Sequence, residues 1–223
     1  MPQDQPALIA AVFDVDRTLV PGTTTERVFI RYLLRRGVIG LAQVARLGWY
    51  LLRALPKLDP MEAVRRQRIY LAGLPVRRVT ALAEECFHQE IQRRISPAGV
   101  AAVREHHAQG HVTVLLSGSL DFLLLPLQRY VGADHLIATH LEVRNGRLTG
   151  RIEGPWPYGP TKAALIRHFA AEHGVAFAGS YAYADHHTDI EVLELFGQPV
   201  VVNAKPKMAA LAHERRWETR EFR

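Results

Sequence analysis

The sequence predicts an α/β protein built on a doubly wound parallel sheet, with a helical insert near its N-terminal end. Short apolar runs alternate with helical segments over most of the chain, as in sheets whose parallel strands are joined by crossover helices. The run at 8–13 is apolar at every position, which is typical of a strand buried on both faces. Between about 24 and 95 the apolar positions instead recur with helical periodicity.

The first strand is expected to end at Asp14, directly after the apolar run. In the helical stretch that follows, glycines and prolines interrupt the pattern and divide it into about four helices. These breaks fall at 37–40, 56–60 and 73–75. The stretch therefore reads as a helical insert between the first strand and the rest of the sheet.

Strands and helices alternate again after Pro97. Asn145-Gly146 lies between two alternating runs, which predicts a tight type I′ hairpin and an antiparallel appendage to the sheet. The other expected strands are at 112–117, near 135–139, at 181–184 and at 199–202, and the expected helices run to 110, over about 120–131, 161–173 and 188–196, and at the C-terminal end.

The composition bounds the class of protein. With 223 residues, 48% hydrophobic and 22% charged, the chain can bury a sizeable core, which excludes disorder over its full length. Its net charge of +6 suits an anionic partner without choosing one. Cys86 is the only cysteine and the polar start does not resemble a signal peptide, so a cytoplasmic location is expected. No stretch of about 20 apolar residues predicts a transmembrane segment, and nothing indicates an oligomeric state.

Polar side chains gather where the predicted strands end. Ligands bind at this edge of an open parallel sheet, because the loops after neighbouring strands converge there. Several carboxylates at one edge would repel each other unless a cation lay among them, and hard oxygen ligands favour Mg²⁺. A lysine and a serine suit a phosphoryl group, which one carboxylate can attack while a second acts as acid and base. The residues are Asp14, Asp16, Ser117, Lys162, Asp185 and Asp189.

Four segments in this order resemble the motifs of the haloacid dehalogenase superfamily. They are DVDRT at 14–18, LLSGS at 115–119, GPTKAAL at 159–165 and DHHTD at 185–189. The helical insert between the first two is similar to that of the phosphoserine-phosphatase-like subfamily, subfamily IB. The resemblance implies a Rossmann-like catalytic core formed by 1–22 and 96–223, with a helical cap domain at 23–95.

The resemblance also implies roles for individual residues. Asp14 matches the nucleophile and a metal ligand, and Asp16 matches the acid/base, whose backbone carbonyl binds the metal. Asp185 matches the side-chain metal ligand and Asp189 the supporting carboxylate. Groups that orient the nucleophile or hold phosphate are matched by Thr18, Ser117, Gly118 and the catalytic Lys162. The implied activity is Mg²⁺-dependent hydrolysis of a phosphomonoester through an aspartyl phosphate on Asp14, with a small phosphorylated metabolite, phosphoserine-like or lipid-like, as substrate.

Two residues depart from the pattern, and other functions stay open. Arg17 stands where many relatives have glycine, and His186 follows Asp185 where they have a small residue. The same core could serve phosphoryl transfer to another metabolite or dehalogenation, although a halide leaves without the acid that Asp16 would supply. A non-catalytic basic protein that binds anions or membranes is the remaining alternative. A nucleic-acid partner is not expected, since no recognised motif for one is present.

Overall fold

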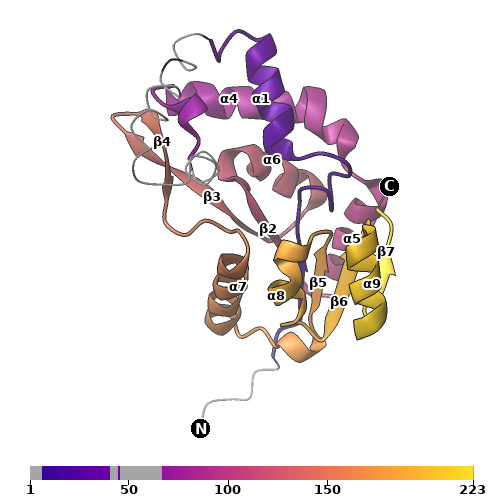
Figure 1. Cartoon of the computed structure of the whole chain (residues 1–223). Helices are drawn as coiled ribbons and strands as arrows, with labels where there is room; N and C mark the ends of the chain where they lie inside the picture. The colour runs from indigo at the N-terminus through magenta and orange to yellow at the C-terminus, as the bar shows by residue number, and fades with distance from the viewer. Residues whose placement is uncertain (1–6, 41–44, 46–66, 223) are drawn as a thin grey trace, which may run out of the picture.

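A seven-stranded sheet forms the centre of the protein, in the order β4-β3-β2-β1-β5-β6-β7 (Figure 1). The computed structural model describes residues 7–40, 45 and 67–222. Neighbouring strands are parallel except β3 and β4, which form an antiparallel hairpin. The strands are β1 Ala10–Phe13, β2 Val112–Leu120, β3 His135–Arg144, β4 Arg147–Glu153, β5 Tyr181–Ala184, β6 Gln198–Val202 and β7 Glu218–Arg220.

Helices cover both faces of this sheet, as a doubly wound fold requires. Side chains alternate along β1, so Phe13 packs with the helices of one face and Val12 with those of the other. The first face carries α1 Thr25–Arg35, α4 Val76–Cys86, α5 Pro97–Ala108 and α6 Asp121–Val131, and the second carries α7 Pro160–His173, α8 Ile190–Leu193 and α9 Pro206–Arg215. The predicted α/β class is therefore confirmed.

The hairpin of β3 and β4 is not the separate appendage that the sequence predicted. Strand β3 pairs in parallel with β2 and then continues to Arg144, so one strand belongs to both the sheet and the hairpin. Asn145 and Gly146 have φ values of 50° and 72°, as the predicted type I′ turn requires.

Four further elements differ from their predicted extents. The first strand, predicted over 8–13, begins at Ala10, and Leu8 and Ile9 before it are exposed. Strand β2 continues beyond 117 to Leu120. The helix predicted over 188–196 is a 3₁₀ turn followed by the short α8. Strand β7 was not predicted, because its polar sequence ETR lacks the apolar pattern of a buried strand.

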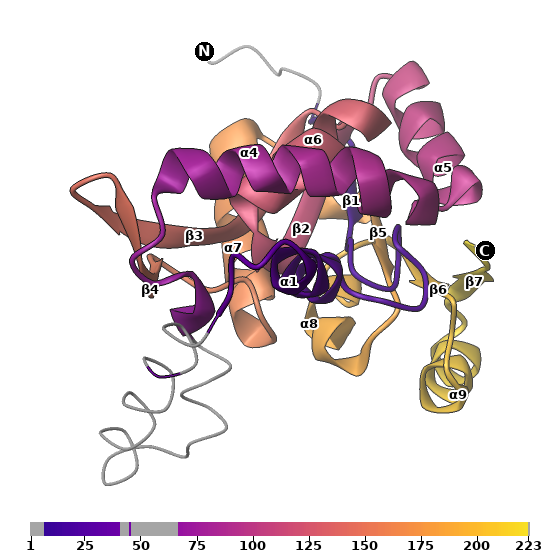
Figure 2. The same cartoon turned by 90° about the horizontal axis from the view of Figure 1, so that it is seen from above.

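The described part of the insert is mainly helical, with turns at 36–40 and 72–75. Helix α1 begins after Thr24, whose side chain caps the Arg27 N–H, and α4 continues through a π-helical turn at Phe87–Ile91. Figure 1 shows both at the end of the molecule opposite α7 and α8, and Figure 2 shows α4 running across α1. Predicted helices within 41–44 and 46–66 lie outside the described residues, and the domain limits 23–95 stay a prediction.

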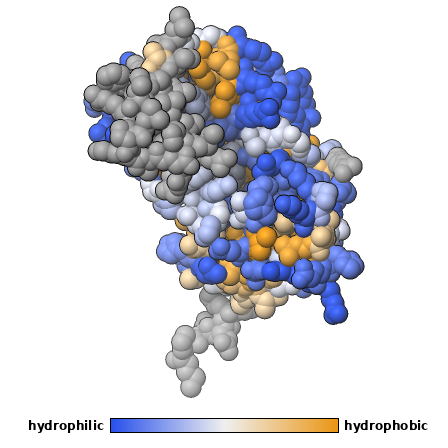
Figure 3. Space-filling model, viewed as in Figure 1, coloured by the Kyte–Doolittle hydropathy of each residue, from blue (hydrophilic) through white to orange (hydrophobic). Residues whose placement is uncertain are grey.

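The surface is mainly polar on the face drawn in Figure 3, where apolar residues gather in a few patches. Most large apolar side chains of the described residues are buried. Within the described ranges, no helix is long and apolar enough to cross a membrane.

Candidate active site

The candidate active site lies at the carboxyl ends of three adjacent strands, β2, β1 and β5. The loops after these strands converge with the start of α7 around a cavity of about 180 Å³. The sequence predicted this convergence, and almost all of the predicted site residues line the cavity. The exception is Thr18, which is fully buried behind Asp14.

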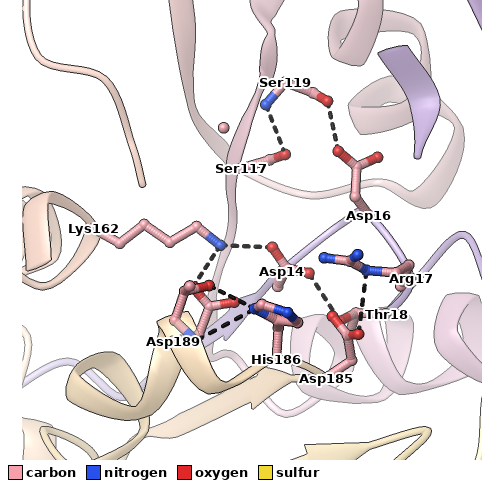
Figure 4. Close-up of polar contacts among 12 residues, drawn as sticks. Asp14, Asp16, Arg17, Thr18, Ser117, Ser119, Lys162, Asp185, His186 and Asp189 are labelled. Carbon is pink, nitrogen blue, oxygen red and sulfur yellow. Dashed lines mark hydrogen bonds and ion pairs between the residues drawn. The ribbon is translucent and has the colours of Figure 1, made fainter. Parts of the chain in front are cut away.

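Asp14 is a buried carboxylate held by two predicted partners (Figure 4). Lys162 Nζ lies 2.7 Å from its Oδ1, and Thr18 Oγ1 donates to its Oδ2 at 2.9 Å. Lys162 Nζ also lies 2.9 Å from Asp189 Oδ1. Burial lowers the pKa of Lys162, but the Asp14 and Asp189 carboxylates outweigh it and hold that pKa above its ordinary value. Lys162 therefore stays charged, although a cation at a helix N-terminus opposes the helix dipole.

Asp16 is surrounded by hydroxyl and amide groups instead of a cation. Its Oδ1 accepts hydrogen bonds from the Thr25 backbone N–H and hydroxyl, at 2.6 and 2.9 Å. Ser119 Oγ lies 2.6 Å from its Oδ2 (Figure 4). Burial raises the pKa of Asp16, against the lowering effect of the hydrogen bonds from Ser119 and Thr25. A carboxyl group that holds its proton more firmly than usual suits an acid/base.

Asp185 faces Arg17, the residue noted in the sequence only as a departure. Arg17 Nε lies 3.4 Å from Asp185 Oδ2. Burial, reinforced by the charge of Asp14, raises the pKa of Asp185 to about 7. Arg17 itself has the uncommon φ of 70°, and its carbonyl oxygen accepts a 2.9 Å hydrogen bond from Asn203 Nδ2. Such backbone strain is characteristic of functional sites.

The acidic groups fit a divalent cation. Asp185 Oδ1 is buried with no hydrogen-bond partner among the described residues, which is the state a cation would relieve. In the part of the chain that the structure describes, no three acidic, histidine or cysteine side chains converge into a ligand set. Mg²⁺ does not need one, because it usually takes one or two carboxylates and completes its shell with water and phosphate oxygens. Asp14 and Asp185 can supply the carboxylates.

His186 contributes a neutral ring to the cavity wall. Burial, followed by the nearby charges of His187 and Arg17, lowers its pKa to about 4. Its Nδ1 lies 3.0 Å from Thr188 Oγ1. The imidazole therefore adds no positive charge near neutral pH.

Several cavity residues were missed in the sequence. Arg68 is only 8% exposed, and its Nε lies 2.5 Å from Glu26 Oε1, which also accepts a 2.6 Å hydrogen bond from the Tyr70 hydroxyl. No motif marks this pair, because its members are far apart in an arginine-rich segment. Ser119, although part of the LLSGS motif, was given no role in the sequence, and Thr25, Trp156 and Tyr158 lie outside the four motifs.

Gly118 shows why a residue without a side chain is needed at the end of β2. A Cβ atom there would lie 3.1 Å from the carbonyl oxygen of Pro157, in the loop between β4 and α7. The Gly118 carbonyl accepts a 2.7 Å hydrogen bond from the Thr139 hydroxyl. The loop and the strand end therefore approach closely enough to form one wall of the cavity.

Known proteins resemble this chain in sequence and in fold. The chain is 32% identical over 96% of its length to the inhibition of morphological differentiation protein of Streptomyces azureus, covering 78% of that protein. It is 30% identical over 96% of its length to a phosphoserine phosphatase of Mycobacterium tuberculosis, covering 71% of it. A solved phosphoserine phosphatase structure, that of a phospho-aspartyl intermediate analogue, superposes with a TM-score of 0.64 at 20% identity, covering 96% of this chain and 92% of the other.

The family itself is shown by a match over most of the chain. The sequence model of the haloacid dehalogenase-like hydrolases matches residues 11–194, which include all four motifs and the insert. This range contains the buried Asp14–Lys162 contact and the hydroxyl-held Asp16. The chain belongs to the haloacid dehalogenase-like hydrolase family.

Proposed function

We propose that the protein is a Mg²⁺-dependent phosphatase that forms an aspartyl phosphate on Asp14. One observation carries this proposal: two carboxylates, two residues apart, line one cavity in different environments. Asp14 is paired with the Lys162 ammonium group, whereas Asp16 is buried among hydroxyl groups. The first environment stabilises a carboxylate anion, and the second favours a proton carrier.

In the first step, a carboxylate oxygen of Asp14 attacks phosphorus and forms the new P–O bond of an acyl phosphate. The bond between phosphorus and the ester oxygen breaks, and Asp16 gives its proton to the departing alkoxide. Lys162 holds Asp14 in place and lies where it can neutralise charge on the phosphoryl oxygens.

In the second step, water attacks the phosphorus of the aspartyl phosphate while the Asp16 carboxylate accepts its proton. The bond between phosphorus and the Asp14 oxygen then breaks, which releases phosphate and restores both side chains. Mg²⁺ held by Asp14, Asp185 and the Asp16 carbonyl would neutralise phosphoryl charge throughout.

The cavity favours a small substrate. Its volume of about 180 Å³ is below the roughly 300–1,000 Å³ typical of drug-sized ligand sites. Beyond the phosphoryl site it presents one charge of each sign, on Glu26 and Arg68. Together with the relative named a phosphoserine phosphatase, this supports a small phosphorylated amino compound as substrate.

The test compares Asp14→Asn and Asp16→Asn with the wild type on an aryl and an alkyl phosphate. Asp14→Asn should abolish turnover, because an amide is a poor nucleophile. Asp16→Asn should slow the alkyl ester more, since an alkoxide needs the proton that a phenolate does not, and general acid catalysis is worth about 10²- to 10⁴-fold. Mass spectrometry of acid-quenched protein should find the phosphoryl group on Asp14.

Two results would contradict the proposal. Phosphate attached to a residue other than Asp14 would contradict the assignment of Asp14 as nucleophile. Turnover that survives exhaustive chelation would contradict the requirement for Mg²⁺. Release of less inorganic phosphate than alcohol would instead indicate transfer to a second acceptor. We expect inorganic phosphate and alcohol to be released in equal amounts.

A further inference from the structure

We propose that Trp156 and Tyr158 form a leaving-group subsite that selects phosphomonoesters whose alcohol joins a planar ring to an ammonium group. The proposal rests on the phosphatase activity proposed above and deepens it. The two rings stack with centroids 4.6 Å apart and an interplanar angle of 9°. Both line the cavity that contains Asp14 and Lys162.

The aromatic wall is anchored to the phosphoryl site. Trp156 Nε1 lies 3.4 Å from the Gly118 carbonyl oxygen, and the Tyr158 N–H donates to the Trp156 carbonyl at 2.8 Å. Two residues after Tyr158 the chain enters α7, whose first turn carries Lys162. The rings are therefore tied to both β2 and α7, which fixes their position relative to the group that reacts.

The wall is also available to a ligand. Tyr158 is 44% exposed, although a large ring next to a polar cavity gains free energy when it is covered. A second hollow lined by Trp156, Tyr158, Pro155 and Ile152 adjoins the same rings. A planar group lying against this stack would cover aromatic surface that water covers in its absence.

The charges of the cavity favour a cationic leaving group. Five acidic side chains and three basic ones line it. The two charges of Mg²⁺ are balanced by those of the phosphoryl group, so the lining retains an excess of negative charge even when Asp16 carries its proton. Glu26 lies on the side of the cavity where Arg68 approaches the Trp156 ring, at 5.9 Å. Arg68 and the Tyr70 hydroxyl both contact Glu26 Oε1, so an ammonium group would approach the other carboxylate oxygen of Glu26 and the aromatic faces.

The experiment measures kcat/KM with Mg²⁺ for three esters. L-Histidinol phosphate has both the ammonium group and a ring, whereas phosphoethanolamine and O-phosphoserine have the ammonium group alone. The ring ester should exceed both others by about 3- to 10-fold, the range that one aromatic stack provides. Because stacking acts equally in the ground and transition states, the advantage should appear in KM.

Variants of Tyr158 test whether the stack causes the preference. Tyr158→Ala should bring the ratio of ring ester to phosphoethanolamine close to one, whereas Tyr158→Phe, which keeps the ring, should retain it. Tyr130→Ala is the matched control, since Tyr130 is a similarly exposed tyrosine on α6 outside the cavity. It should leave the ratio unchanged. A ratio measured on one preparation does not depend on how much of that variant is folded.

The proposal fails separately from the phosphatase assignment. Equal or faster hydrolysis of phosphoethanolamine or phosphoserine by the wild type would overturn it while Asp14 chemistry stands. The proposal would also be overturned if Tyr158→Ala and Tyr158→Phe lost the preference for the ring ester equally, because the preference would then depend on the hydroxyl group. No phosphate release from any ester would overturn both.

Discussion

Asp14 and Asp16 show how single residues of the same type are given different tasks. They leave the same strand end, but Asp14 meets the Lys162 ammonium group and Asp16 meets the Thr25 and Ser119 hydroxyls. A fixed cation favours the ionised form of a carboxyl group, whereas burial without one favours the protonated form. The proposed division into nucleophile and acid/base follows from these partners.

Asp185 gives a prediction about the metal-free protein. Burial and the Asp14 charge raise its folded-state pKa to about 7, above the ordinary value of 3.8. Between about pH 4 and 7 the folded state therefore binds more protons than the unfolded state, so the stability that Asp185 contributes is lost as pH rises. Asp185→Asn should remove this loss, which is at most about 1.4 kcal/mol per pH unit for one proton. Urea unfolding in chelator at pH 4.5 to 7.5 measures it.

The comparison must be made between variants, because two histidines act in the opposite direction. Burial lowers the pKa of both His106 and His186 to about 4, so their contribution to stability increases as pH rises through this range. His106 is hydrogen-bonded to Tyr183 and distant in the chain from Asp185, so its effect should be common to both proteins. Parallel pH profiles for the wild type and Asp185→Asn would contradict the raised pKa.

At the scale of elements, the β3–β4 hairpin positions a residue of the site. The Arg68 N–H donates to the Gly150 carbonyl at 2.7 Å, so strand β4 carries the segment that presents Arg68 to the cavity. Gly150 has φ of 83°, and a Cβ atom there would lie 3.0 Å from the Arg68 carbonyl oxygen. The glycine is needed for both its conformation and this close approach.

Gly150→Ala should therefore displace Arg68 and impair substrate binding as well as stability. Gly132→Ala is the matched control, because Gly132 has φ of 79° but a Cβ atom added there would meet nothing within 4 Å. Both substitutions should lower the free energy of unfolding by about 1 to 2 kcal/mol, because alanine is strained in the left-handed backbone conformation. Only Gly150→Ala should also raise KM for the substrate, by about tenfold or more. Equal KM values in steady-state kinetics would show that this contact does not position Arg68.

At the scale of the whole molecule, the insert and the sheet share one apolar core. Phe29 of α1 and Val79 of α4 belong to the same buried cluster as Phe13 of β1 and Leu123 of α6. The insert also contributes to the chemistry, since Thr25 supplies two of the hydrogen bonds to Asp16. Removal of 23–95 would therefore alter both the packing and the proposed acid/base.

The shared core predicts that the insert and sheet unfold together. Amides of α1, α4 and β1 should exchange with solvent through openings whose free energies agree within about 1 kcal/mol, because the elements form one cooperative unit. Native-state hydrogen exchange followed by mass spectrometry measures this on the intact protein. If the opening free energy for amides of α1 and α4 were several kcal/mol lower than that for amides of β1, the insert would instead unfold as a separate unit.

The sequence by itself determined the parallel strands β1, β2, β5 and β6, the order of the motifs and the place where they meet. Apolar runs and turn residues are local signals that can be recognised in the sequence. Parallel strands bring the residues after Phe13, Leu116 and Ala184 to one edge of the sheet, independently of the conformation of the loops. For this reason Asp14, Lys162 and Asp185 could be placed in one site from the sequence. The Asn145-Gly146 turn was likewise set by backbone conformation alone.

Only the tertiary structure decided what surrounds those groups. Arg68 reaches the cavity because β4 carries it there, and Trp156 because its loop packs on Gly118. Ser119 closes on Asp16 from β2, and Arg17 turns toward Asp185 from a left-handed backbone. These contacts join residues distant in the chain, and their energies depend on burial and on neighbouring charges, which a local pattern of residues does not specify.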